Sequence, residues 1–138
     1  MRVLVIDDEP DVLMLCRMNL ERAGHEVLEA SSGHEGLALA QRERPDLVVL
    51  DLMLPTIDGF AVLDDLASDE ATRDVPVILL TAKTHREDRR AAWVAGCAGY
   101  MTKPFSPIEL VGLVDRTHRM SKQERSTRRE QALMGLGG

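Results

Sequence analysis

The sequence lacks the features that distinguish secreted, thiolate-metal and membrane-spanning proteins. Its 138 residues include two cysteines that are not spaced as metal ligands, and two free thiols explain them better than one disulfide. The first apolar run, residues 3–6, stops at two aspartates and is therefore not a signal peptide. No apolar run approaches the length that crosses a membrane. These absences predict a cytoplasmic protein with no membrane partner.

The sequence also has no excess of basic residues and no cluster of histidines. The net charge is −6, so we expect no direct binding of this domain to nucleic acid. The four histidines are scattered along the chain and have no metal-ligand spacing. What is present is a balance of 44% hydrophobic and 29% charged residues, which is typical of one globular domain at this length.

Short apolar runs alternate with segments of helical pattern along the chain. Capping boxes that start at Ser32, Thr84 and Ser106 mark the beginnings of three of the helices. Five strands alternating with five helices predict an α/β fold with right-handed crossovers and a parallel sheet. The predicted strands cover residues 3–6, 25–30, 47–50, 75–80 and 99–102, and the second, mixed in polarity, is expected at an edge.

Polar residues follow four of these strands. Asp7 and Asp8 end the first strand, Asp51 the third, Thr81 the fourth and Lys103 the fifth. The carboxyl ends of parallel strands meet at one edge of the sheet, so these side chains are expected to converge. Crowded carboxylates need a cation, and ligand sets of oxygen alone favour Mg²⁺. Beside a metal, a lysine and a hydroxyl, Asp51 is equipped to accept a phosphoryl group.

Each of these residues alone has an ordinary explanation. The paired aspartates would be a solvated turn, Thr81 a helix cap and Lys103 a surface lysine. Five such coincidences at one edge are improbable, so we interpret the set as a site. Trp93 is different, because its position beside small apolar residues favours packing at the edge of the core over partner binding.

From about Met1 to about Arg119 the sequence resembles the response-regulator receiver domains of two-component signalling. The resemblance depends on Asp7-Asp8, Asp51 in Asp-Leu-Met-Leu-Pro, Asp58-Gly59, Thr81-Ala82, Ala95-Gly96 leading to Tyr100, and Lys103-Pro104-Phe105. It implies a flavodoxin-like, doubly wound (βα)5 fold with strand order 2-1-3-4-5. It also implies that a histidine kinase phosphorylates Asp51.

The resemblance assigns further roles at the same edge. It implies that Asp8, Asp51 and the backbone carbonyl of Met53 hold Mg²⁺, with Asp7 assisting. Met53 and Lys83 occupy positions that tune loss of the phosphoryl group in the family.

The resemblance also implies which residues contact the phosphoryl group and which residues change position when it is present. Lys103, the Thr81 hydroxyl and the Ala82 N–H are expected to contact the group, and the Lys103–Pro104 peptide is expected to be cis. Thr81 and Tyr100 are implied to form the switch, which changes the surface of the fourth helix, last strand and last helix.

We expect a receiver domain over residues 1–120 and a charged, glycine-ended tail over 121–138 that extends the last helix and then becomes disordered. No effector domain is visible. The chain is therefore interpreted as a single-domain regulator or as the N-terminal part of a longer one. Its expected partners are a histidine kinase or phosphotransfer protein, a downstream effector protein or output domain, and a second copy in a homodimer on activation.

The predicted function is a phospho-acceptor switch that catalyses only its own phosphorylation and dephosphorylation. The alternative is a Mg²⁺-dependent phosphatase or phosphotransferase with an aspartyl-phosphate intermediate. Enzymes of that kind carry a general acid two residues after the nucleophile, where this chain has Met53, which cannot transfer a proton. A scaffold that only resembles a receiver is disfavoured, because no acceptor-site residue is missing.

Overall fold

The computed structural model describes residues 1–55, 57–82 and 85–135. The predicted capping residue Thr84, the predicted tuning residue Lys83 and the last three residues of the tail that was predicted to become disordered, 136–138, lie outside the described residues. None of the described helices combines the length and the apolar character of a segment that crosses a membrane.

Five parallel strands form one sheet in the order β2-β1-β3-β4-β5, which confirms the predicted fold class and strand order. The strands are β1 (Arg2–Ile6), β2 (Glu26–Ala30), β3 (Leu47–Leu50), β4 (Val77–Thr81) and β5 (Gly99–Thr102). β4 begins two residues later than predicted. The reason is local, because the Val75 N–H donates to the Thr72 carbonyl in a turn and Pro76 has no N–H for a ladder.

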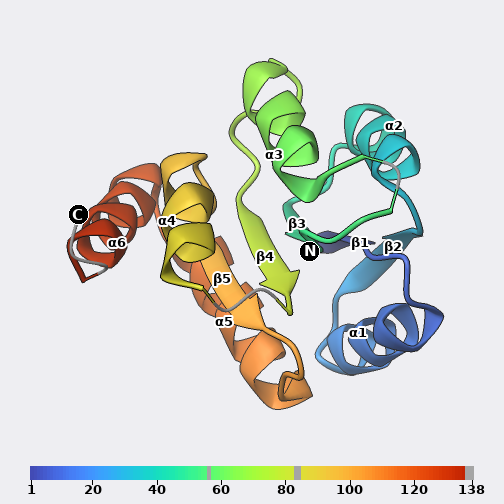
Figure 1. Ribbon diagram of the computed structural model, residues 1–138. Coiled ribbons are helices and arrows are strands. Elements are labelled where there is room, and N and C mark those ends of the chain that lie inside the picture. The colour runs from blue at the N-terminus through green and yellow to red at the C-terminus, as the bar shows by residue number, and fades with distance from the viewer. Residues whose placement is uncertain (56, 83–84, 136–138) are drawn as a thin grey trace.

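Helices cover both faces of the sheet (Figure 1). They are α1 (Pro10–Arg22), α2 (Gly33–Glu43), α3 (Gly59–Ser68), α4 (Arg86–Val94), α5 (Pro107–Arg119) and α6 (Lys122–Gly135). The predicted caps at Ser32 and Ser106 are confirmed, since their side chains accept from the N–H groups of Glu35 and Glu109 at 3.2 and 3.4 Å.

The core has two halves, one on each face of the sheet. Leu4 and Ile6 of β1 pack with α2, α3 and α4, while Val3 and Val5 pack with α1 and α5. Strands buried on both faces have no polar alternation, which is why they appear in the sequence as continuous apolar runs. Trp93 is buried in the first half, so the packing interpretation of this residue is confirmed.

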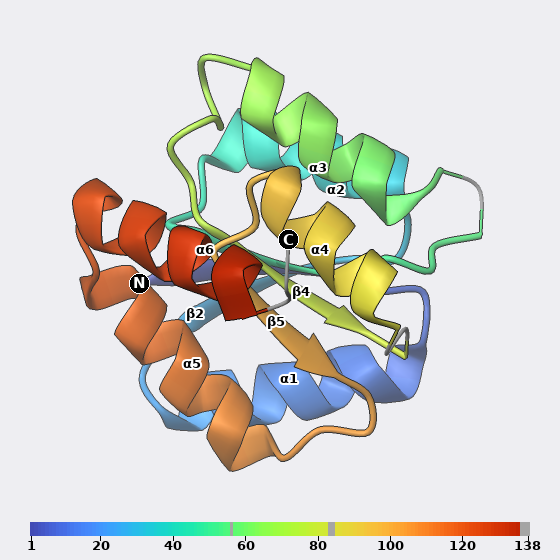
Figure 2. The same cartoon turned by 60° about the vertical axis from the view of Figure 1, so that its left-hand side comes forward.

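The prediction that the tail extends the last helix is wrong. α5 ends at Arg119, and Met120 adopts an extended conformation with φ −76° and ψ 138°. Ser121 then opens a new helix, because its Oγ accepts from the Glu124 N–H at 3.1 Å and Glu124 Oε1 accepts from the Ser121 N–H at 3.1 Å. α6 turns back and packs beside α4 (Figure 2).

Candidate functional site

The ends of β1 and β3 bring two buried carboxylates together. Ile6 and Leu50 are paired in register, so the residues that follow them, Asp7 and Asp51, emerge side by side. The Asp51 N–H donates to the Ile6 carbonyl at 3.0 Å, and the Asp7 N–H donates to the Ala30 carbonyl at 3.1 Å. The two residues are only 3% and 1% exposed.

Two exposed carboxylates complete the group, which we call the acidic rim: Asp7, Asp8, Glu9 and Asp51. One carboxylate oxygen from each lies within 4.8 Å of the others. Asp7, Asp8 and Asp51 were predicted from the sequence, but Glu9 was not. The signal for Glu9 was its place directly after Asp8, in the turn before Pro10.

Lys103 reaches into the acidic rim from the end of β5. Its Nζ lies 2.8 Å from Asp7 Oδ2, 2.9 Å from Glu9 Oε1 and 3.2 Å from Asp51 Oδ2. Burial by itself lowers the pKa of Lys103, but the contacts with Asp7 and Glu9 outweigh it, and the pKa is raised above its ordinary value. The ammonium group therefore stays charged at every physiological pH.

The acidic rim fits a divalent cation. Burial raises the pKa of Asp7, and the contact with Lys103 only partly opposes this effect. Asp7 Oδ2 is buried, and the Nζ of Lys103 lies 2.8 Å from it. Lys103 pairs with three of the four carboxylates, Asp7, Glu9 and Asp51, and the group of four offers oxygen donors only, which is the ligand chemistry that Mg²⁺ prefers.

The loop after Asp51 is held by close packing. The Met53 N–H donates to Asp51 Oδ1 at 2.9 Å and fixes the orientation of the carboxylate. Asp58 caps α3 by accepting from the Phe60 N–H at 2.8 Å. A Cβ on Gly59 would lie 2.4 Å from the Leu52 Cα and 2.6 Å from the Asp51 carbonyl oxygen, so only glycine allows α3 to approach Asp51 so closely.

The predicted contact and switch residues lie on the neighbouring strands. Thr81 is wholly buried at the end of β4, and Ala82 is exposed directly after it. The Lys103 N–H donates to the Thr81 carbonyl at 2.8 Å, and the predicted cis Lys103–Pro104 peptide is confirmed. Tyr100 is half-buried on β5, opposite Leu79 of β4.

A groove of about 440 Å³ opens beside the acidic rim. Its lining is mainly apolar and consists of Glu9, Val12, Leu15, Ala82, Lys103, Pro104 and Phe105. Met14 and Met18 of the same helix, α1, are 61% and 54% exposed. The charged side chains of Glu9 and Lys103 thus border a mainly apolar surface.

The sequence profile of the response regulator receiver domain matches residues 3–115. The chain therefore belongs to this family of two-component signalling domains. α6 begins beyond the matched residues.

Individual relatives support this assignment. The chain is 45% identical to the DNA-binding regulator RpaA of Synechocystis over 82% of this chain and 47% of RpaA. It is 42% identical to the transcriptional regulatory protein PhoP of Bacillus subtilis over 88% of this chain and 50% of PhoP, so it spans about half the length of these two curated relatives. Protein PilH of Pseudomonas aeruginosa is 38% identical over 83% of this chain and 94% of PilH.

Solved structures agree with the fold. The chemotaxis protein CheY4 of Vibrio cholerae has a TM-score of 0.80 and 30% identity over 84% of this chain and 97% of that chain. The beryllofluoride-activated receiver domain of RstA from Klebsiella pneumoniae has a TM-score of 0.80 and 27% identity over 87% of this chain and 100% of that chain.

Proposed function

We propose that this chain is a phospho-acceptor switch in which Asp51 takes a phosphoryl group from a phosphohistidine or a small phosphodonor. The observation that carries the proposal is the pairing of a buried Asp51 with Lys103 at 3.2 Å inside the acidic rim. A carboxylate in this setting is oriented, shielded from water and next to a fixed positive charge. Those are the requirements for a nucleophile that attacks phosphorus.

The chemistry of the transfer is simple. An oxygen of Asp51 forms a bond to phosphorus while the bond from phosphorus to the imidazole nitrogen of the donor breaks, and the departing imidazole takes up a proton. The Met53 N–H holds Oδ1 of Asp51, and Oδ2, beside Lys103, is the proposed attacking oxygen. Lys103 neutralises the incoming oxygens, with the Thr81 hydroxyl and the Ala82 N–H as the further donors.

Mg²⁺ is the proposed cofactor, held by Asp8, Asp51 and the Met53 carbonyl with Asp7 in support. When bound, it would supply the positive charge that four carboxylates and three phosphoryl oxygens require. Glu9 belongs to the same set of oxygen donors, although its carboxylate is also engaged by Lys103.

The partners follow from the surfaces. The apolar groove beside Ala82 and Phe105, with the exposed methionines of α1, suits a histidine kinase or phosphotransfer protein that must bring its phosphohistidine to Asp51. The face of α4, β5 and α5 is the proposed output surface, read by an effector protein, an output domain or a second copy. We place this exchange in the cytoplasm.

Mass spectrometry after incubation with Mg²⁺ and acetyl phosphate tests the proposal. One stable phosphoryl group per chain is expected, and Asp51→Asn should remove it because an amide is a poor nucleophile. Asp58→Asn makes the same chemical change at a nearby exposed cap and should leave phosphorylation intact. A phosphoryl group that persists in Asp51→Asn would overturn the assignment.

The same experiment separates a switch from an enzyme. A phosphatase with an aspartyl-phosphate intermediate would turn over a generic phosphate ester many times per chain. Met53 stands where such an enzyme needs its general acid, and its side chain is 52% exposed. We therefore expect stoichiometric labelling and no sustained turnover.

A further inference from the structure

α6 presents a narrow face to the rest of the molecule. Its half-buried residues are Arg125, Arg128, Ala132 and Leu133, which recur at helical spacing on one side. No residue of α6 is fully buried. A helix of this length is only marginally stable alone in water, so the contacts of this face decide whether it forms.

Arg128 is the polar anchor of α6. Its Nη1 donates to the Ala98 carbonyl at 2.8 Å and to Thr117 Oγ1 at 3.0 Å, which joins α6 to the start of β5 and to α5. Burial lowers the pKa of Arg128, and the charge of Arg116 adds to this effect. The guanidinium is therefore partly desolvated, and its hydrogen bonds depend on α6 remaining in place.

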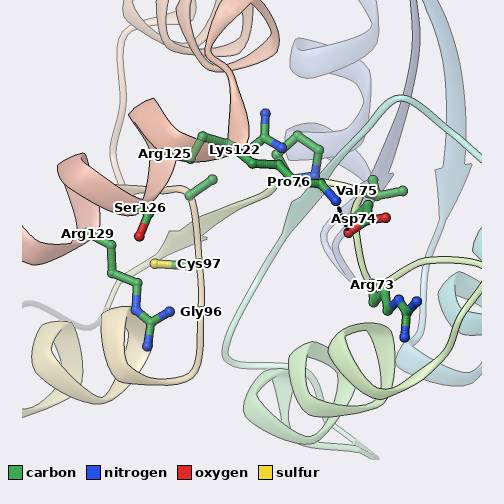
Figure 3. A pocket seen from close by; sticks show the side chains of 11 residues that line it. Arg73, Asp74, Val75, Pro76, Gly96, Cys97, Lys122, Arg125, Ser126 and Arg129 are labelled. Atoms are coloured by element: carbon green, nitrogen blue, oxygen red, sulfur yellow. Dashed lines mark ion pairs between the residues drawn. The ribbon is translucent and has the colours of Figure 1, made fainter.

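The first half of α6 covers a hollow of about 220 Å³ that is incompletely filled (Figure 3). Lys122 spans its rim to Asp74 at 2.8 Å, and Arg129 extends beside Gly96 and Cys97. Arg73 points away from α6 in the same view, so the cations do not converge as an anion site would require. This half of the contact is loosely packed.

The second half of α6 covers a groove of about 370 Å³ that contains the predicted switch residue. Ala132 and Gly135 face Arg89, Trp93, Tyr100 and Thr102 across it. Thr102 is the register partner of Thr81, and Tyr100 lies two residues earlier on the same face of β5. The same residues of β5 that pair with the end of β4, next to the acceptor site, therefore line this groove.

We propose that α6 is a tethered ligand of the surface formed by α4, β5 and α5, bound in the resting state and displaced when Asp51 is phosphorylated. The proposal rests on the phospho-acceptor function proposed above. A change at Thr81 alters the position of Thr102 or Tyr100, and Ala132 and Leu133 then lose their packing surface. A partner gains access to the same surface only when α6 has left it.

Energetics favour displacement over rigid attachment. An interface with unfilled space under both halves forgoes part of its dispersion energy, and exposed backbone hydrogen bonds open readily. The phosphoryl group can shift this equilibrium only by the difference in affinity of α6 for the two states. A loosely packed helix on the switch residue therefore needs only a small change in its groove to be released.

Hydrogen exchange of the full chain tests the proposal. Amides of residues 122–135 should be protected in the resting protein, and with Mg²⁺ and beryllofluoride their exchange should accelerate by at least about fivefold, the lower end of typical coupling between sites. Thr81→Ala, which loses one proposed donor, should accept the phosphoryl group more slowly from acetyl phosphate, and α6 of the fraction that mass spectrometry shows to be labelled should stay protected. Unchanged protection of α6 in the activated parent chain would overturn the proposal.

Two arginine substitutions provide a matched pair. Arg128→Ala removes the anchor and should expose the α6 amides even without activation. Arg119→Ala makes the same change on α5, where the side chain donates, among the described residues, only to the Asp115 carbonyl of its own helix, and it should behave as the parent chain does. Equal exchange of α6 in both variants would contradict the anchoring role.

Failures of the two proposals are distinguishable. If acetyl phosphate adds no mass to the parent chain, the phospho-acceptor function fails and this inference fails with it. If the mass rises while α6 stays protected, only the inference fails. Protection of α6 that increases with protein concentration would mean that α6 binds a second copy, which would overturn its assignment within one chain.

Discussion

Two ion pairs of the same length lie at opposite ends of the sheet. Lys103 and Asp7 are 2.8 Å apart beyond the ends of β5 and β1, and Lys122 and Asp74 are 2.8 Å apart before the start of β4. The side chains of the first pair are 13% and 1% exposed, and those of the second are 72% and 64% exposed. Distance alone therefore says little about what each pair does.

The pKa values of the two aspartates show the difference. Burial raises the pKa of Asp7 despite its lysine, whereas the hydrogen bond from Lys122 lowers the pKa of Asp74. Desolvation dominates at the acidic rim, and solvent screens the pair on α6. The rim concentrates negative charge that a metal cation would relieve, while the pair between Lys122 and Asp74 is a solvent-screened surface contact.

The largest effect should come from removing the lysine of the buried pair. Lys103→Ala leaves Asp7 and Asp51 buried without their cation, and it should lower the free energy of unfolding by about 3 kcal/mol in metal-free buffer. Lys122→Ala should cause no measurable change. Urea unfolding with a chelator measures both, and equal losses would contradict the comparison.

Mg²⁺ should reverse much of the loss in Lys103→Ala. A ligand that binds only the folded state at about 100 times its Kd adds about 2.7 kcal/mol of stability. Repeating the urea series with Mg²⁺ measures this gain, which should be absent in the double variant Lys103→Ala, Asp8→Ala.

A second effect concerns packing at the acceptor. Gly59→Ala forces a Cβ against the Leu52 Cα and should cost about 1–3 kcal/mol and slow phosphorylation by displacing the Asp51 loop. Gly112→Ala in α5 meets only the end of the Arg116 side chain and should gain about 0.5–1 kcal/mol. Thermal unfolding of both variants, with labelling by acetyl phosphate, distinguishes the two sites.

The metal site gives a third, smaller effect. Asp8→Ala should weaken Mg²⁺ binding by at least about tenfold, while Asp51 remains available as acceptor. Calorimetric titration measures the affinity, and Asp74→Ala is the control at the other end of the sheet. An unchanged affinity in Asp8→Ala would remove Asp8 from the ligand set.

The smallest effect should follow removal of the exposed end. Deleting residues 121–138 should leave the affinity for Mg²⁺ alone within about twofold of the parent value, because α6 is proposed to respond to the phosphoryl group on Asp51 and not to the metal. A larger change in the titration would mean that the tail influences the acidic rim directly.

The acidic rim was predictable because strand ends determine it. An apolar run that stops at Asp7 or Asp51 indicates where the strand lies and that the carboxylate follows its carboxyl end. In a parallel sheet the carboxyl ends of the strands lie at the same edge, so the two carboxylates come together. Glu9 was missed because its side chain projects from a turn, where the sequence gives no direction. The positions of Asp7 and Asp51 could be predicted without knowing how their side chains are oriented.

α6 could not be placed from the sequence in the same way. The Ser121-x-x-Glu124 box was a readable signal of a new helix and was overlooked within a charged stretch. The direction of α6 could not be predicted from the sequence. It depends on the break between α5 and α6 at Met120 and Ser121, and on single contacts such as the hydrogen bond from Arg128 to the Ala98 carbonyl. A charged sequence of this kind has no periodic apolar pattern from which the face of the helix that packs on the domain could be predicted.

The groove under α6 also determines what can be seen of this protein by optical spectroscopy. The chain has one tryptophan and one tyrosine, and Trp93 and Tyr100 both line that groove. Near-ultraviolet circular dichroism and intrinsic emission of the whole protein therefore originate mainly at the contact of α6 with α4 and β5. The molecule contains a natural, label-free reporter at the one surface where its signalling state is proposed to be read.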